Sequence, residues 1–95
     1  MAKFTKPLFK LGQVVATPGA LEAFEDAQEV PLDYIRRHVM GDWGEVPPED
    51  AEENAKSLQH GWRILSAYKL GTGVKFWIIT EADRSSTCIL LPEEY

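Results

Sequence analysis

The sequence predicts an α+β fold in which a short N-terminal strand and three helices precede a three-stranded antiparallel meander. Apolar residues recur at helical spacing between residues 18 and 60, and from Trp62 onward they alternate as they do in extended strands. The connections between these segments are short, and no linker is long enough to separate domains. We therefore expect residues 1–95 to form a single domain.

The first predicted elements are a strand at residues 11–17 and a helix at residues 18–28. Thr17 can cap this helix through its side-chain oxygen. Pro18 suits the first helical position, because the N–H that proline lacks would have no partner there. The apolar stripe of the helix consists of Leu21, Phe24 and Ala27. Its acidic residues are expected to face away from the core.

The second and third helices are predicted at residues 31–41 and 48–60. Each begins at a proline and ends at or beside a glycine, Gly41 or Gly61, as helices commonly do. The apolar stripe of the second helix consists of Leu32, Ile35 and Val39. The stripe of the third is thinner and consists of Ala51, Ala55 and Leu58. We expect only a narrow face of the third helix to be buried.

Three strands are predicted at residues 62–70, 74–81 and 86–92, and the glycine-rich loop at 71–73 joins the first two as a hairpin. The second connection, "EADRSS" at residues 81–86, contains side chains that commonly hydrogen-bond to nearby backbone. We interpret it as a turn in preference to a catalytic loop. The central strand is apolar on both faces. One face should carry the helices, and the other should meet aromatic residues, the first strand or a partner.

Composition limits the function classes. Hydrophobic residues make up 44% of the chain, which argues against disorder. Cys88 is the only cysteine, so an intrachain disulfide is impossible, and its apolar surroundings favour a buried thiol. The sequence has no apolar segment of the length of a signal peptide core or a membrane span, so a cytoplasmic protein is expected. It also lacks the glycine motifs of phosphate-binding loops, and no cofactor is expected.

The two histidines, His38 and His60, lie near the ends of the second and third predicted helices. Cations are favoured at that position by the helix dipole. The spacings HxxxH and HxH, which would suggest a metal site, do not occur. We therefore expect no metal.

Charge is distributed unevenly along the chain. The net charge is −5, but residues 22–53 alone carry −9, whereas residues 1–21 carry +3 and residues 54–95 carry +1. Direct binding to nucleic acid requires a basic surface, which this composition does not supply. The acidic middle third instead resembles a polyanion. It is expected to form one continuous negative surface, from Glu22 to Glu53, that a basic protein partner could recognise.

The loop "GDWG" at residues 41–44 adds a tryptophan to this region. Trp43 either covers one end of the core or stands out as an interface anchor. The candidate partner-binding residues are Asp42, Trp43, Glu45, Glu49, Asp50, Glu52 and Glu53.

Several fragments, "LGQVVATPGALEAF", "GDWG", "HGWRILSAY", "WIITEADRSST" and "LLPEEY", together resemble a family of small uncharacterised proteins from bacterial plasmids and integrative elements. The resemblance covers about residues 11–95. It implies a mobile-element context, in which accessory proteins act against host defence.

Three functions follow as hypotheses. The first is a non-enzymatic anti-CRISPR or anti-restriction inhibitor that engages a basic nucleic-acid-binding surface. The second is a structural or antitoxin-like module that dimerises through the aromatic face of the sheet. The third is a small hydrolase, with Glu81, Asp83 and Arg84 beside Asp42 in a cleft.

Overall fold

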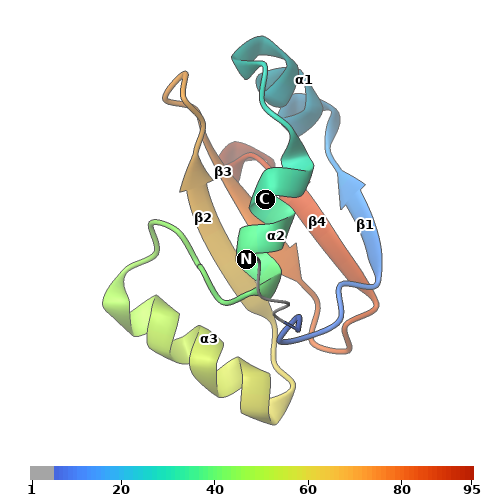
Figure 1. Cartoon of the computed structure of the whole chain (residues 1–95), viewed down its shortest axis with the longest axis vertical. Helices are drawn as coiled ribbons and strands as arrows, with labels where there is room; N and C mark the ends of the chain where they lie inside the picture. Colours follow the sequence, from blue (N-terminus) through green and yellow to red (C-terminus); the bar gives the residue numbers. More distant parts are fainter. Residues whose placement is uncertain (1–5) are drawn as a thin grey trace, which may run out of the picture.

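The computed structural model describes residues 6–95 and confirms the α+β class (Figure 1). The elements are β1 (Gln13–Ala16), α1 (Pro18–Ala27), α2 (Pro31–Val39), α3 (Pro48–His60), β2 (Ile64–Lys69), β3 (Lys75–Thr80), β4 (Ser86–Leu90) and the 3-10 helix η1 (Pro92–Glu94).

The four strands form one mixed sheet in the order β1-β4-β3-β2. Its last three strands in sequence are the predicted antiparallel meander. The sequence did not place β1, which lies parallel to β4 at the edge of the sheet, with Val14 opposite Thr87. The strand order therefore differs from that of an isolated N-terminal strand followed by a meander. The parallel contact joins the N-terminal and C-terminal segments of the domain.

The main core lies between the sheet and the helices α1 and α2. Alternate residues of a strand point to opposite faces, so Tyr68, Phe76 and Ile78 share the helix-facing side of the sheet. Phe24 of α1 packs edge-on against Phe76, with ring centroids 4.8 Å apart, and Ile35 of α2 belongs to the same buried cluster. Tyr34 of α2 also packs on this face, with its ring centroid 4.9 Å from that of Phe76 and 5.2 Å from that of Tyr68, which helps to hold α2 across the sheet in Figure 1.

The helix boundaries follow the predicted caps more closely than the helix faces follow the predicted stripes. The Thr17 side chain accepts a hydrogen bond from the backbone N–H of Ala20 at 3.1 Å, and Gly61 ends α3 with a left-handed φ of 73°. Leu21 and Leu32, expected in the core, are instead 53% and 51% exposed.

The third helix packs through polar residues, because Asn54 and Ser57 are its buried side chains, in place of the expected alanine stripe. The Asn54 amide donates to the carbonyl of Leu65 at 2.7 Å and accepts from the Leu65 N–H at 3.1 Å. It thus makes the two bonds that a neighbouring strand would make to the edge of β2. The next outward-facing residue, Ala67, bonds to the backbone of Trp43 and Glu45. Much of the β2 edge is therefore closed by the protein itself.

The second face of the sheet carries none of the three α-helices. Trp77 and Cys88 are half-buried there, and Ile79 is buried. The C-terminal Tyr95 packs against Trp77 with ring centroids 5.6 Å apart. None of the helices in residues 6–95 combines the length and the apolar character that a membrane crossing requires.

Candidate functional site

The predicted single negative surface is not present. Figure 1 shows α1 and α3 at opposite ends of the molecule, with α2 between them. The exposed side chains of α2 include Arg36 and Arg37, which interrupt the acidic surface. The acidic residues of α1 and α3 therefore form separate groups, and the expectation of one array running from Glu22 to Glu53 is wrong.

Asp42 forms an internal ion pair. Its carboxylate accepts a hydrogen bond from Arg37 Nε at 2.7 Å, and this bond lowers the pKa of Asp42. The Arg37 guanidinium in turn lies 4.7 Å from the ring centroid of Tyr68 and 5.6 Å from that of Tyr34. The Tyr68 hydroxyl donates to the Asp42 carbonyl at 2.6 Å. Asp42 thus fixes the loop after α2.

Trp43 covers part of the core and is half-buried. Its ring stacks on Phe9 with centroids 6.3 Å apart and meets the edge of His38 at 6.0 Å. The next residue, Gly44, has a φ of 76°, and a Cβ there would come within 2.1 Å of the Ala67 carbonyl. This close approach holds Trp43 in place, so the geometry favours a plug over an exposed anchor.

The remaining candidate acids form what we call the α3 acidic segment: Glu45, Glu49, Asp50, Glu52 and Glu53. All five side chains are exposed. One of them, Glu52, lies 3.9 Å from Lys56 in an exposed pair, a kind of contact that contributes little. Acidic residues are favoured at this end of α3 by the helix dipole. The segment is therefore a stable and accessible group of negative charges.

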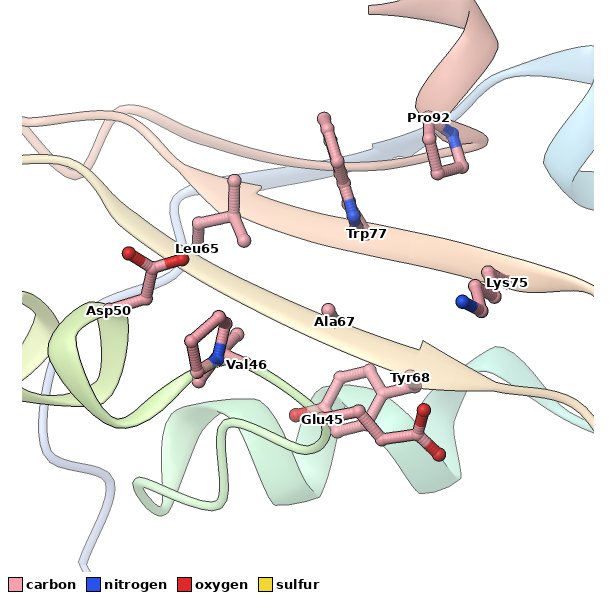
Figure 2. Close-up of a pocket in the computed structure, with 10 residues that line it drawn as sticks. Glu45, Val46, Asp50, Leu65, Ala67, Tyr68, Lys75, Trp77 and Pro92 are labelled. Atoms are coloured by element: carbon pink, nitrogen blue, oxygen red, sulfur yellow. The ribbon is translucent and has the colours of Figure 1, made fainter.

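A groove of about 510 Å³ lies beside this segment on the second face of the sheet (Figure 2). Ala67 of β2 lies in its floor between the larger side chains of Leu65 and Trp77. The other lining residues are Glu45, Val46, Pro47, Asp50, Tyr68, Lys75 and Pro92. We call this hollow the Ala67 groove. Two members of the α3 acidic segment line it, so charge and apolar surface meet there.

The connection between β3 and β4 is a turn, as predicted. Asp83 accepts a hydrogen bond from the backbone N–H of Ser85 at 3.0 Å, and hydrogen bonding from Ser85 lowers the pKa of Asp83. Arg84 donates to the carbonyls of Ser57 at 3.0 Å and Trp62 at 2.6 Å, which ties the turn to the end of α3. These contacts give the turn a structural role.

The cleft expected for a hydrolase is not found at either of two grooves of about 510 Å³ each. One is the Ala67 groove, and the other lies beside α1, with Glu22, Asp26 and Glu93 on its rim. Neither is lined by Glu81, Asp83, Arg84 or Asp42. Within residues 6–95, no cluster of three or more His, Cys, Asp or Glu side chains is placed to hold a metal ion.

A histidine–serine pair that the sequence did not reveal lies in the core. The nitrogens of His38 lie 2.5 Å from Ser66 Oγ (Nδ1) and 2.9 Å from Thr80 Oγ1 (Nε2). Thr80 is 2.7 Å from Thr87, which donates to the Leu11 carbonyl at 2.7 Å. A carbonyl can only accept, so Thr87 donates to Leu11, Thr80 donates to Thr87, and His38 Nε2 donates to Thr80. The proton of neutral His38 is therefore on Nε2, and Ser66 donates to Nδ1.

Burial explains why this pair is structural. His38 and Ser66 are completely buried, so a substrate has no access to the serine. Burial also lowers the pKa of His38 to about 4, so the ring is neutral at pH 7. The expectation that His38 is a cation stabilising a helix end is wrong.

Comparison with protein-family models, curated proteins and solved structures finds no match to this chain.

The sequence did not identify the Ala67 groove, but it contained one relevant signal. A central strand that is apolar on both faces predicts a second face without helices. It does not reveal that the small Ala67 would lie between large neighbours, because that arrangement depends on the cross-strand register.

Proposed function

We propose that this protein is a non-enzymatic binding protein that engages the basic surface of a nucleic-acid-binding protein. Its concrete form would be an anti-CRISPR or anti-restriction inhibitor, as the resemblance to mobile-element proteins implies. The binding surface is narrower than the sequence suggested and consists of the α3 acidic segment together with the Ala67 groove.

One observation carries this proposal: five exposed carboxylates, held by α3 and the loop before it, lie next to an apolar groove. Fixed negative charges steer association with a basic partner, and an adjacent apolar surface adds contact area. Asp42 and Trp43 hold the loop before α3 in place, since Asp42 is paired with Arg37 and Trp43 packs on Phe9.

The test is a phage plating assay in bacteria that carry a restriction or CRISPR system. The variant combines Glu49→Lys, Asp50→Lys, Glu52→Lys and Glu53→Lys. We expect the unaltered protein to protect the phage and the variant to lose most of that protection. Four exposed charge contacts are worth roughly 1–4 kcal/mol together, or about fivefold to a thousandfold in affinity.

The control reverses the three acids of α1, which lies at the opposite end of the molecule from α3: Glu22, Glu25 and Asp26. It should keep its protection. A neutral α3 variant, with Gln and Asn in place of the four acids, separates charge from any unfavourable effect of lysine on the helix start. If the α3 and α1 reversals protect the phage to the same extent, whether fully or poorly, the proposed surface is ruled out.

The second face of the sheet also supports the alternative of a dimerising module, because Trp77 and Tyr95 lie on it without a covering helix. Sedimentation of the purified protein distinguishes the two functions. A concentration-dependent dimer that Trp77→Lys disrupts would favour the module.

A further inference from the structure

The Ala67 groove has a shape suited to one long side chain. Its floor is apolar, formed by Leu65, Ala67 and the Trp77 ring, and Val46 lies on the side opposite Trp77. Pro47 also lines the groove. The hollow exists because Ala67 contributes one methyl group where its neighbours are large. A side chain from a partner could lie over Ala67 along the strands.

The charges of the groove are arranged along its length. Figure 2 places Asp50 at the Leu65 end, and Glu45 and Lys75 at the other end. Asp50 forms no ion pair within 4.0 Å in the described part of the chain. A cationic group entering the groove thus meets the Asp50 carboxylate at the Leu65 end, whereas the opposite charges of Glu45 and Lys75 offset each other at the other end.

The same chemistry already holds an arginine inside this protein. The Arg37 guanidinium lies 4.7 Å from the Tyr68 ring centroid and pairs with the Asp42 carboxylate at 2.7 Å. An aromatic ring next to a carboxylate is a favourable site for guanidinium, which is more weakly hydrated than ammonium and stacks on ring faces. Trp77 and Asp50 both line the Ala67 groove, so the groove supplies the same two kinds of group, an aromatic ring and a carboxylate, along its length.

We propose that the Ala67 groove receives an arginine side chain of the basic partner, with its stem over Ala67, its guanidinium against Trp77 and its charge paired with Asp50. This inference rests on the proposed function and specifies the partner chemistry. Lysine fits less well, because its ammonium group loses more hydration on entering an apolar groove and cannot stack on the indole. A nucleic-acid phosphate would be repelled by Asp50 and Glu45.

The test uses the full-length ¹⁵N-labelled protein and three small probes: N-acetyl-arginine amide, the lysine counterpart and the uncharged citrulline counterpart. Two-dimensional NMR follows the Trp77 indole N–H and the Ala67 amide. We expect a saturable shift of both resonances with arginine, a weaker one with lysine and none with citrulline. Equal shifts with arginine and citrulline would overturn the proposal, because they would show that charge has no part in binding.

Two substitutions localise the site. Ala67→Leu fills the groove without changing charge and should abolish the saturable shift. Asp50→Asn should weaken binding up to about fivefold. Thr72→Leu, which places leucine in the groove beside α1, is the matched control and should bind arginine normally. The spectra themselves verify that each variant is folded.

Failure of the arginine-site proposal and failure of the proposed function would give different results. If Ala67→Leu binds arginine as the unaltered protein does, the groove proposal is wrong, whereas loss of phage protection in the α3 reversal would still support the function. If arginine binds the groove but the α3 reversal protects phage normally, the proposed function is wrong and the groove remains an arginine site.

Discussion

His38 is completely buried, and each of its ring nitrogens lies within hydrogen-bonding distance of a core hydroxyl, Ser66 Oγ on one side and Thr80 Oγ1 on the other. The hydrogen bonds continue from Thr80 through Thr87 to the Leu11 carbonyl, which can only accept, so the donor and acceptor of each bond are defined. A second proton on His38 would make Nδ1 a donor, so the Ser66 hydroxyl would have to rotate to accept it and would lose the acceptor of its own proton. The bonds from His38 through Thr80 and Thr87 to Leu11 connect α2, β3, β4 and the segment before β1, and the Ser66 bond, which adds β2, is satisfied on both sides only while His38 is neutral.

This arrangement predicts that the protein becomes less stable as the pH is lowered. The pKa of His38 is about 4 in the folded protein because of burial, whereas an unfolded histidine titrates near 6.5. Between those values the unfolded chain binds a proton that the folded chain does not. The contribution of neutral His38 is therefore complete above about pH 6.5 and lost by about pH 4, up to about 3 kcal/mol.

Urea unfolding between pH 7 and pH 4 measures this loss, and His38→Gln is the control. The variant should be less stable at pH 7 but should lack this part of the pH dependence, since glutamine does not titrate. An identical slope in both proteins would contradict the role of His38. The sequence placed His38 near a helix end, but its partners Ser66 and Thr80 lie 28 and 42 residues away, too far for local patterns to reveal them.

At the scale of elements, helix boundaries were more predictable than helix faces. Pro48 and Gly61 mark the ends of α3 through local backbone chemistry, which the sequence contains in full. The face that α3 buries depends on what lies opposite, and what lies opposite is the backbone edge of β2. Asn54 satisfies that edge, whereas a hydrophobic side chain would leave the Leu65 N–H and carbonyl without partners.

Replacing Asn54 by alanine should therefore destabilise the protein by about 2–4 kcal/mol, because two partly buried backbone groups lose their hydrogen bonds. Gln59→Ala on the same helix is the matched control, because Gln59 is exposed. It should change the free energy of unfolding by less than about 0.5 kcal/mol. Urea unfolding of both variants measures the difference, and similar values would show that the Asn54 bonds contribute little.

At the scale of the whole molecule, the sequence predicted the meander but not the mixed sheet or the division of the acidic residues into two groups. Both depend on where β1 and the helices lie relative to β4, and contacts between distant segments leave no periodic pattern. A linear count of charge over residues 22–53 could not show that α2 would separate the acids of α1 from those of α3.

Gly12 controls the contact between β1 and the rest of the sheet. Its φ is 64°, and a Cβ there would lie 2.3 Å from the Ser85 backbone. Gly73 has a φ of 95° but open space around it. Gly73→Ala should cost about 1–3 kcal/mol from backbone strain alone. Gly12→Ala should cost more, because the close approach to the Ser85 backbone, just before β4, is also lost.

Urea unfolding of the two glycine variants isolates this second effect. Hydrogen exchange should show that Gly12→Ala accelerates the β1 and β4 amides more than its loss of global stability accounts for, whereas Gly73→Ala should accelerate them only by that amount. Equal destabilisation by the two substitutions would mean that β1 adapts without losing its pairing.

Because the β2 edge is closed, a further strand can pair with the sheet more readily at the opposite edge. Asn54 and the Trp43–Glu45 backbone occupy that side, whereas β1, with its exposed Val14 and Val15, is the last strand on the other. Strand addition during aggregation would therefore begin at β1. A lysine at Val14 would disfavour pairing of another strand with the β1 edge, while the α3 acidic segment and the Ala67 groove would be unchanged.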